Sequence, residues 1–367
     1  MVHGIRISFR QLKHVVKVKL RLRRRGQTDL ASGIDVLEEE LQGSGSIIGY
    51  RQIHQRLQND HGIIVSSYSN RETVWLALGV LDPVGVSERR RGRLIRRKYF
   101  CKGPNYLWHI DGYDKLKPFG FCIHGAIDGY SRRIMSLEVG STNNNPAVVA
   151  KYYTECVRQI GGVPRIIRAD NGTENCTIAG LQRFFRTDHT DAFAGEKCFM
   201  YGRSVTNQRI EAWWSFLRRS NADWWIVYFK ELRDNGLFCD DNILQSACLK
   251  FCFIPILQRE LYRVACHWNT HGIRPYPNQE TEHGKADVLF FIPEMTGAND
   301  YKSPLDIDTL GTVEETFCVE QSQFGCEKEF IDVFLMLMEE NNLMNPTNAT
   351  EAENLYLTLL TLLQGVV

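Results

Sequence analysis

Three strand-like segments, followed by a helix and a fourth strand, restrict the fold of this chain most strongly. The strand-like segments are residues 106–113, 121–128 and 132–140. They are separated by Gly, Pro and Asp-Gly turn signals. Residues 146–162 then carry apolar side chains at helical spacing, with Pro146 at the start and Gly161 at the end. Because one more strand-like run follows at 164–170, the order of elements predicts an α/β sheet of mixed strand direction, flanked by helices.

Charge divides the chain into three parts. Residues 1–100 hold 19 Lys and Arg against 9 Asp and Glu, which gives +10. Residues 101–295 hold 23 against 21, which gives +2, and residues 296–367 hold 2 against 13, which gives −11. The basic first part predicts an anionic partner, with nucleic acid as the first candidate. Two solvated charged faces are the alternative explanation.

The basic part also has the spacing of a helix-turn-helix. We expect three helices in this part. The first covers residues 6–20, the second lies within residues 47–62 and ends at Gly62, and the third follows its N-cap Ser69, whose capping-box partner is Glu72. This layout predicts a helical DNA-binding region over residues 1–99, although helical hairpins are also common structural elements. The arginines expected to contact DNA in this region are Arg71, Arg89, Arg90 and Arg91.

The acidic tail, residues 296–367, is expected to be separate and partly disordered, because only residues 355–364 resemble a short helix. No apolar run approaches the roughly 20 residues of a membrane span. The 11 Cys include no CxxC pair and therefore predict reduced thiols in an intracellular protein. Cys248 and Cys252 have a spacing that a metal site can use, but small apolar thiols in a core helix explain it better.

Carboxylates at strand ends and on one helix are the candidate catalytic groups. Asp170 ends the run 164–170 and precedes Asn-Gly, so it fits both a site at the carboxyl end of a strand and a simple turn. Glu211 lies on the polar face of a predicted helix, where it is either a site residue or a surface partner of Arg218 or Arg219. Rivals after Asp170 lack such a helix face, and they are Glu174, Asp188, Asp191 and Glu196.

The tetrapeptide Ile-Asp-Gly-Tyr occurs twice, at residues 110–113 and 127–130. Asp111 lies within the first strand, whereas Asp128 begins the Asp-Gly-Tyr-Ser turn of a hairpin. We therefore expect Asp111 to belong to the site and Asp128 to cap the turn. His109 is expected to be structural and to face away from Asp111.

The segments LWHIDGY, IIRADNGTEN and NQRIEAWW resemble the three acidic motifs of the DDE integrase core, the retroviral integrase and transposase superfamily with a ribonuclease-H-like fold. AIDGYSRRI and HWNTHGIRPYPN resemble further parts of that core, and the similarity covers residues 104–295. It is closest to integrase-core proteins of transposon origin in animals. The resemblance implies that Asp111, Asp170 and Glu211 form a catalytic triad that holds Mg²⁺ or Mn²⁺ for hydrolysis and transesterification of DNA ends.

The resemblance also implies a DNA-bound, nuclear protein that acts as a homo-oligomer. Side chains near the acidic residues are expected to contact DNA, and those on Arg are expected to pair with phosphates. These candidates are Asn171, Glu174, Arg203, Arg209, Arg218 and Arg219.

The chain departs from the family pattern in three ways, and the last two leave an alternative function open. The zinc-binding His-x-x-x-His and Cys-x-x-Cys unit of retroviral integrases is missing before the core, so we expect no zinc there. The opening segment resembles the second half of a helical pair whose first helix is missing, and the acidic tail has no recognised counterpart. A domesticated, catalytically silent DNA- or chromatin-binding protein is therefore the alternative. A plain ribonuclease-H-like nuclease is disfavoured by the integrase-type segments after Glu211.

Overall fold

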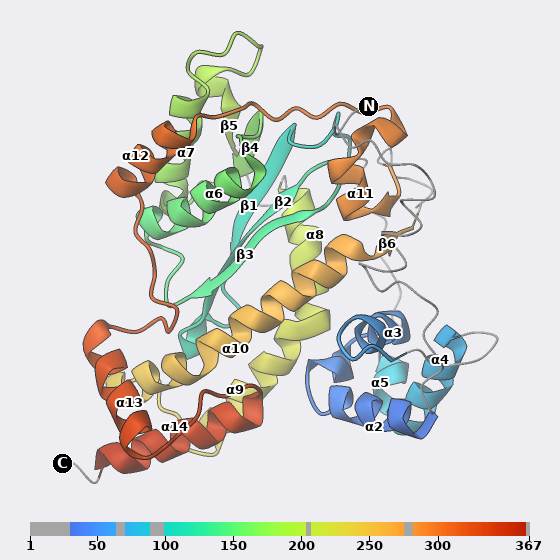
Figure 1. The fold of residues 1–367 in the computed structure, drawn as a ribbon, viewed down its shortest axis with the longest axis vertical. Helices are drawn as coiled ribbons and strands as arrows, with labels where there is room; N and C mark the ends of the chain where they lie inside the picture. The colour runs from blue at the N-terminus through green and yellow to red at the C-terminus, as the bar shows by residue number, and fades with distance from the viewer. Residues whose placement is uncertain (1–29, 64–69, 89–98, 203–206, 275–281, 365–367) are drawn as a thin grey trace. The chain divides into compact units, whose positions relative to one another are not determined.

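The computed structural model describes residues 30–63, 70–88, 99–202, 207–274 and 282–364 (Figure 1). The chain divides into two compact units, Met1–Arg91 and Gly92–Val367.

The first unit is helical within its described residues. Its helices are α2 (Leu30–Leu41), α3 (Tyr50–Asn59), α4 (Asn70–Leu81) and α5 (Pro83–Glu88). Leu37, Ile53 and Val74 share one buried cluster, so apolar side chains from three of these helices hold the unit together. The helices expected before Gly62 and around Glu72 are thus present. The predictions for residues 6–20, for Ser69 and for Arg89, Arg90 and Arg91 lie outside the described residues.

The second unit contains a five-stranded sheet in the order β3-β2-β1-β4-β5. The strands are β1 (Leu107–Tyr113), β2 (Cys122–Asp128), β3 (Ile134–Gly140), β4 (Ile166–Ala169) and β5 (Phe199–Tyr201). β1, β2 and β3 pair antiparallel, whereas β4 pairs parallel with both β1 and β5. This mixed sheet with helices on its faces confirms the predicted ribonuclease-H-like α/β fold.

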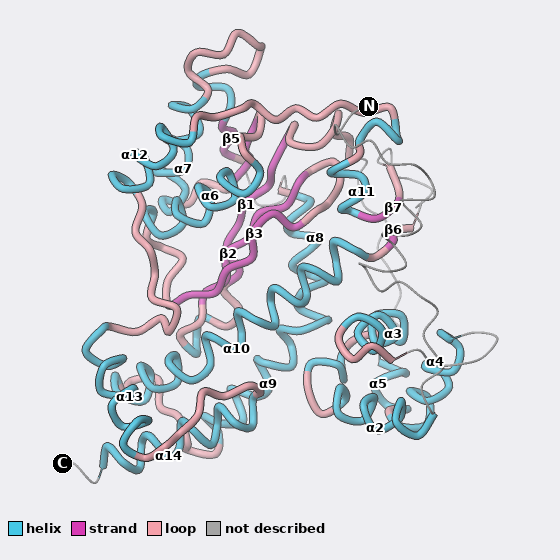
Figure 2. Tube along the Cα trace, in the orientation of Figure 1, coloured by secondary structure: helices cyan, strands magenta, loops and turns pink. Residues whose placement is uncertain are grey.

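Alternation along β1 separates the two faces of the sheet, whose strands are magenta and whose flanking helices are cyan in Figure 2. Trp108 and Ile110 join the buried cluster of α6 (Pro146–Ile160) and α7 (Cys176–Phe185). Tyr113 joins the cluster on the other face. That face is covered by α8 (Gln208–Leu217), α9 (Asp223–Asp234) and α10 (Ile243–Thr270). Strand residues two apart therefore share a face, which brings the odd-numbered side chains of β1 toward α8.

The segment expected to be a separate tail packs on this sheet domain instead. It forms α12 (Ile307–Phe317), α13 (Lys328–Glu340) and α14 (Ala349–Gln364), after the short elements β6 (Gly272–Ile273), β7 (Gly284–Lys285) and α11 (Ala286–Phe291). Leu310 is buried in the cluster of α6, and Phe334 and Tyr356 are buried in the cluster of α10. The structure differs from the expectation because the apolar residues of the tail pack against helices that lie far away in the sequence.

Two amide side chains of α10 cover the free edge of β3. Gln258 accepts a hydrogen bond from the Val139 backbone N–H at 2.8 Å and donates one to the Leu137 carbonyl at 3.0 Å. Asn269 makes the same pair of contacts with the backbone of Ile134, at 2.8 and 3.1 Å. An unpaired strand edge can pair with another chain and cause aggregation. The amides of α10 protect this edge, because they take the hydrogen bonds that a sixth strand would make. None of the helices in the described parts of the chain is long and apolar enough to cross a bilayer.

Candidate active site

Asp111 and Asp170 lie on neighbouring parallel strands. Asp111 is near the end of β1, and Asp170 directly follows β4. The register pairs Leu107 with Ile166, Trp108 with Ile167 and His109 with Arg168. The same offset puts Asp170 level with Asp111. Because neighbouring strands are about 4.8 Å apart, Asp111 and Asp170 are neighbours near the carboxyl ends of the two parallel strands.

Helix α8 supplies the third carboxylate. Glu211 lies in its first turn, and its backbone N–H donates to the Asn207 carbonyl at 3.2 Å. Asn207 is buried, accepts a hydrogen bond from His109 Nδ1 at 2.6 Å and donates one to the Ile110 carbonyl at 2.8 Å. The start of α8 is therefore fastened to β1, and this fixes the distance from Glu211 to the strand that carries Asp111.

His109 is structural, as expected, but the expected direction of its side chain is wrong. It precedes Asp111 by two residues, so both side chains point to the α8 face of the sheet. Its ring is fully buried between Tyr99, whose hydroxyl lies 2.7 Å from Nε2, and Asn207. Burial lowers the pKa of His109 to about 3, so the ring is neutral and works as a fixed spacer.

The other two carboxylates contribute to the pKa of Asp111. Burial, together with the smaller effect of the negative charges of Glu211 and Asp170, raises the pKa of Asp111 to about 7. The indole N–H of Trp214 opposes this shift by donating to Asp111 Oδ2 at 2.9 Å. The register of β1 and β4 and the contact of α8 with Asp111 likewise place the three acidic residues in the same region of the fold.

Asn175 holds the second carboxylate. This buried amide donates to Asp170 Oδ1 at 3.2 Å and to Glu174 Oε1 at 2.9 Å. The Gly172 backbone N–H also lies 3.3 Å from Asp170 Oδ1. A side chain at Gly172 would overlap the Glu174 carboxylate, because an added Cβ would be 1.8 Å from Glu174 Oε1. The Asp-Asn-Gly sequence therefore forms a turn and presents Asp170 at the same time.

The donor set suits a hard divalent cation. Asp111, Asp170 and Glu211 offer anionic oxygen ligands only, which Mg²⁺ and Mn²⁺ prefer. Glu211 and Asp170 repel the ionised carboxylate of Asp111, and a bound cation would relieve this repulsion. As the side chains stand, no three acidic, His or Cys residues in the described ranges are close enough to surround one ion. The three residues therefore fit a divalent cation by their ligand chemistry and by their position on the fold.

The predicted DNA contacts have different surroundings. Arg218 is exposed and donates to Asp223 at 2.8 Å, and Arg219 is also exposed, as is Asn171. Arg209 lies under the ring of Tyr99, 4.0 Å from its centroid, and donates to the Gly129 carbonyl. That environment favours a bracing role over a contact with DNA. Arg71 is exposed on α4, and Arg203 lies outside the described residues.

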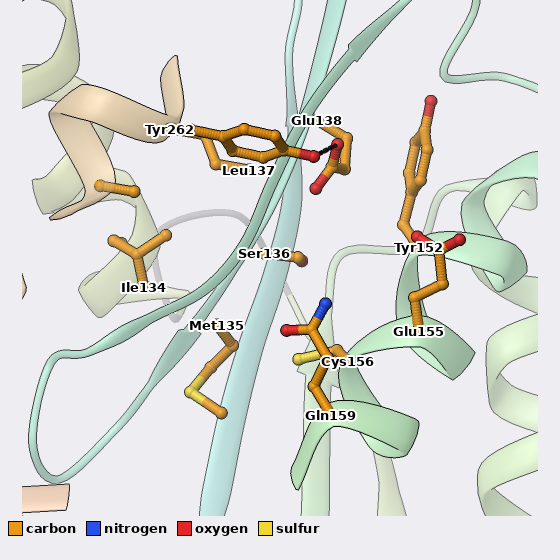
Figure 3. Close-up of a pocket in the computed structure, with 11 residues that line it drawn as sticks. Ile134, Met135, Ser136, Leu137, Glu138, Tyr152, Glu155, Cys156, Gln159 and Tyr262 are labelled. Carbon is orange, nitrogen blue, oxygen red and sulfur yellow. Dashed lines mark hydrogen bonds between the residues drawn. The ribbon is translucent and has the colours of Figure 1, made fainter. Parts of the chain in front are cut away.

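Several other predictions concern residues that lie elsewhere. Asp191 pairs with Arg186 and Arg165, and Glu196 pairs with Arg183, so these rivals of Glu211 are used in ion pairs. Cys248 and Cys252 are buried in α10, and all 11 Cys are free thiols. A small cavity between β3, α6 and α10 is also separate from the triad (Figure 3). There Glu138 accepts a hydrogen bond from the Tyr262 hydroxyl at 2.8 Å.

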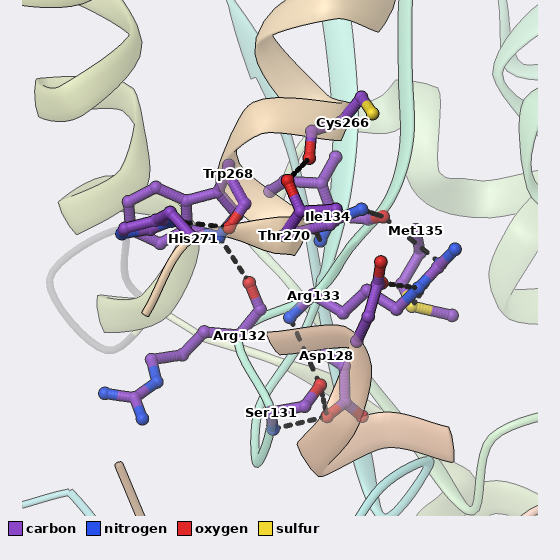
Figure 4. A network of polar contacts seen from close by, with 12 residues as sticks. Asp128, Ser131, Arg132, Arg133, Ile134, Met135, Cys266, Trp268, Thr270 and His271 are labelled. Carbon is purple, nitrogen blue, oxygen red and sulfur yellow. Dashed lines mark hydrogen bonds and ion pairs between the residues drawn. The ribbon is translucent and has the colours of Figure 1, made fainter. Parts of the chain in front are cut away.

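Asp128 caps the hairpin turn between β2 and β3, as the sequence predicted (Figure 4). It is fully buried and accepts hydrogen bonds from the backbone N–H groups of Asn105, Tyr130 and Ser131 and from the Ser131 hydroxyl. The turn is also held by Trp268, whose indole donates to the Arg132 carbonyl at 2.6 Å. With every donor directed at it from within the protein, Asp128 has no role at the triad.

Residues 98–296 match the family model of the integrase core domain, which is more than half of the chain. The chain belongs to this integrase core family. It is a family of DNA integration proteins with polynucleotidyl transferase chemistry, and the integrase-core resemblance is thereby confirmed. Among curated proteins no match is found.

Three residues that support the integrase site were not identified from the sequence. They are Asn207, Asn175 and Trp214. Asn207 and Trp214 lie on either side of Glu211 at α8. Their positions four residues before and three residues after Glu211 carry the signal, because such residues share a helix face with the carboxylate.

Proposed function

We propose that this integrase-core protein is a DDE polynucleotidyl transferase that cuts and joins DNA ends. The observation that carries the proposal is the gathering of Asp111, Asp170 and Glu211 where β1, β4 and α8 meet. These three residues would hold two Mg²⁺ or Mn²⁺ ions. When bound, the ions would supply Lewis-acid chemistry for attack of water or a DNA 3′-hydroxyl on a phosphodiester.

The protein residues contribute position and charge. Asn207 holds the start of α8 on β1, and Asn175 holds the Asp170 carboxylate. Glu211 is placed in the first turn of α8, at the positive end of the helix dipole. No side chain has to form a covalent intermediate in this reaction.

The first test is a DNA-end cleavage and strand-transfer assay with Mg²⁺, using the repeats that flank the gene. We expect Asp111→Asn, Asp170→Asn and Glu211→Gln each to lower the rate by about a thousandfold or more, because several kcal/mol of transition-state stabilisation are lost. The matched control is Asp114→Asn, since Asp114 follows β1 but pairs with exposed Lys117. Full activity of any triad variant would remove that residue from the site.

The same assay distinguishes the proposed transferase from the alternative function. A wild-type protein that binds these DNA ends but neither cuts nor joins them would be a catalytically silent DNA- or chromatin-binding protein. Binding itself is proposed to involve the basic helical unit, mainly through phosphates. We expect Arg71→Ala to weaken DNA binding and to lower the salt dependence by about one counterion. An unchanged salt dependence would assign binding to other residues.

The proposal extends to location and assembly. A protein that acts on chromosomal DNA in an animal cell would work in the nucleus, and joining two DNA ends needs at least two active sites held together. We therefore propose a nuclear homo-oligomer. Light scattering of the protein with and without DNA ends tests the assembly, and a monomer in both conditions would contradict it.

A further inference from the structure

The indole of Trp214 connects helix α8 to the carboxylate of Asp111. Its Nε1–H donates to Asp111 Oδ2 at 2.9 Å. Trp214 follows Glu211 by three residues, so both leave the same face of α8. One helix thus carries the third carboxylate and also the hydrogen-bond donor for the first.

The indole fits because the strand beside it lacks a side chain. Gly125 of β2 is the register partner of Asp111 on β1. A Cβ at Gly125 would lie 2.7 Å from Cη2 of Trp214, closer than real side chains approach. The ring of Tyr113 lies 5.3 Å from the indole, which is itself only 5% exposed. The absence of a side chain at Gly125 and the contact with Tyr113 therefore define the position of the Trp214 indole.

A neutral donor has a specific advantage at this carboxylate. The indole N–H can donate but cannot accept, so it favours the ionised form of Asp111. It carries no charge, so it orients the carboxylate without neutralising it, unlike a Lys or Arg at the same place. An anionic and oriented carboxylate is what a divalent cation requires.

We propose that Trp214 is a positioning residue that holds Asp111 Oδ2 and so sets the direction in which this carboxylate meets a divalent cation. The inference rests on the proposed function of the triad. Gly125 belongs to the same device, because it provides the space in which the indole lies.

The chain offers a matched control. Trp225 is fully buried and donates its Nε1–H to the Glu260 carboxylate at 2.8 Å. This second indole–carboxylate pair joins α9 to α10 and involves none of the triad residues. Trp214→Phe and Trp225→Phe therefore remove the same hydrogen bond and the same ring volume, but only the first changes the contact with Asp111.

The experiment measures Mn²⁺ binding to the full chain by isothermal titration calorimetry. We expect Trp214→Phe to weaken binding by about 10- to 100-fold, the usual cost of removing a group that orients a metal ligand. Trp225→Phe should bind Mn²⁺ like the wild type. Gly125→Ala keeps both Trp214 and Asp111 but moves the indole, so it should also weaken binding. Asp111→Asn provides the reference for a lost ligand.

The outcomes separate the inference from the proposed function. If Asp111→Asn loses Mn²⁺ but folded Trp214→Phe stays within about twofold of wild type, the positioning role is overturned and the triad stands. If Asp111→Asn binds Mn²⁺ as wild type does, or if wild type binds none, both fall.

A second measurement needs no folded variant. Addition of Mg²⁺ to the ¹⁵N-labelled wild type should shift the indole N–H resonance of Trp214 and leave that of Trp225 in place. An indole of Trp214 that does not respond to bound Mg²⁺ would overturn the inference.

Discussion

The two Ile-Asp-Gly-Tyr segments have the same sequence and opposite environments. Asp128 is fully buried and accepts four hydrogen bonds, from three backbone N–H groups and one hydroxyl. Asp111 is only partly buried, and among the described residues it accepts from the indole of Trp214 and from the Gly112 backbone. The carboxylate of Asp128 is saturated by donors from within the protein, whereas that of Asp111 retains lone pairs for a ligand.

The pKa values of the two residues express this difference. Burial raises the pKa of both groups, to about 6 for Asp128 and to about 7 for Asp111. The more deeply buried residue has the smaller shift, because the donors from Ser131, Asn105 and Tyr130 favour its ionised form. At Asp111 the charges of Glu211 and Asp170 act in the opposite direction. Surplus negative charge, and not burial alone, distinguishes the candidate active site.

The largest effect is expected from Asp128→Ala. Removal of the carboxylate leaves buried donors without a partner, so we expect the free energy of unfolding to fall by about 3–5 kcal/mol. Urea denaturation measures it, with the exposed Asp241→Ala as control, which should change stability by less than about 0.5 kcal/mol. A small loss for Asp128→Ala would end the distinction between the two carboxylates.

Asp111→Asn is expected to have the opposite sign in metal-free buffer. The folded-state pKa of about 7 lies above the ordinary 3.8, so ionisation of Asp111 destabilises the fold. The stability that Asp111 contributes is present at low pH and is lost as the pH rises from about 4 through 7. Since Asn stays neutral, the variant should be more stable than wild type by roughly 1–3 kcal/mol at pH 8, with a smaller difference at pH 5.

Glu138→Gln is the control for this pH dependence. Burial also raises the pKa of Glu138, to about 7, but this residue lies in the cavity of Figure 3 and not at the triad. Both variants should gain stability at pH 8 without metal. Addition of Mg²⁺ should stabilise wild type and Glu138→Gln but not Asp111→Asn, as thermal unfolding can measure. Equal stabilisation of all three would contradict a metal site at Asp111.

Ser131→Ala sharpens the comparison with the smallest change. It removes the hydroxyl that donates to Asp128 Oδ2 at 2.7 Å and leaves the backbone donors in place. We expect a loss of about 1.5–3 kcal/mol in the free energy of unfolding, the usual contribution of one hydrogen bond to a charged group. DNA-end cleavage should be unaffected, because Ser131 contacts the turn and not the triad.

Local pattern predicted the central part of the fold. The segments 106–113, 121–128 and 132–140 became β1, β2 and β3, and Pro146 and Gly161 mark the ends of α6. These elements have strong periodicity and clear turn residues, so neighbouring residues determine them. The prediction for the tail was wrong, although residues 330–338 of α13 do carry the apolar pattern of a helix. Local sequence does not show that α12 and α13 pack on distant helices of the sheet domain.

The sequence by itself determined the integrase family, the order of strands and the three acidic motifs. Motif spacing also separated Asp111 from Asp128, since one lies within a strand and the other in a turn. Only the tertiary structure decided that His109 and Asn207 fasten α8 to β1 and that Trp214 reaches Asp111. Those contacts join residues about a hundred positions apart, and their geometry depends on how a helix packs on a sheet. Spacing along a chain specifies which chemistry is available, whereas packing specifies which groups hold it in place.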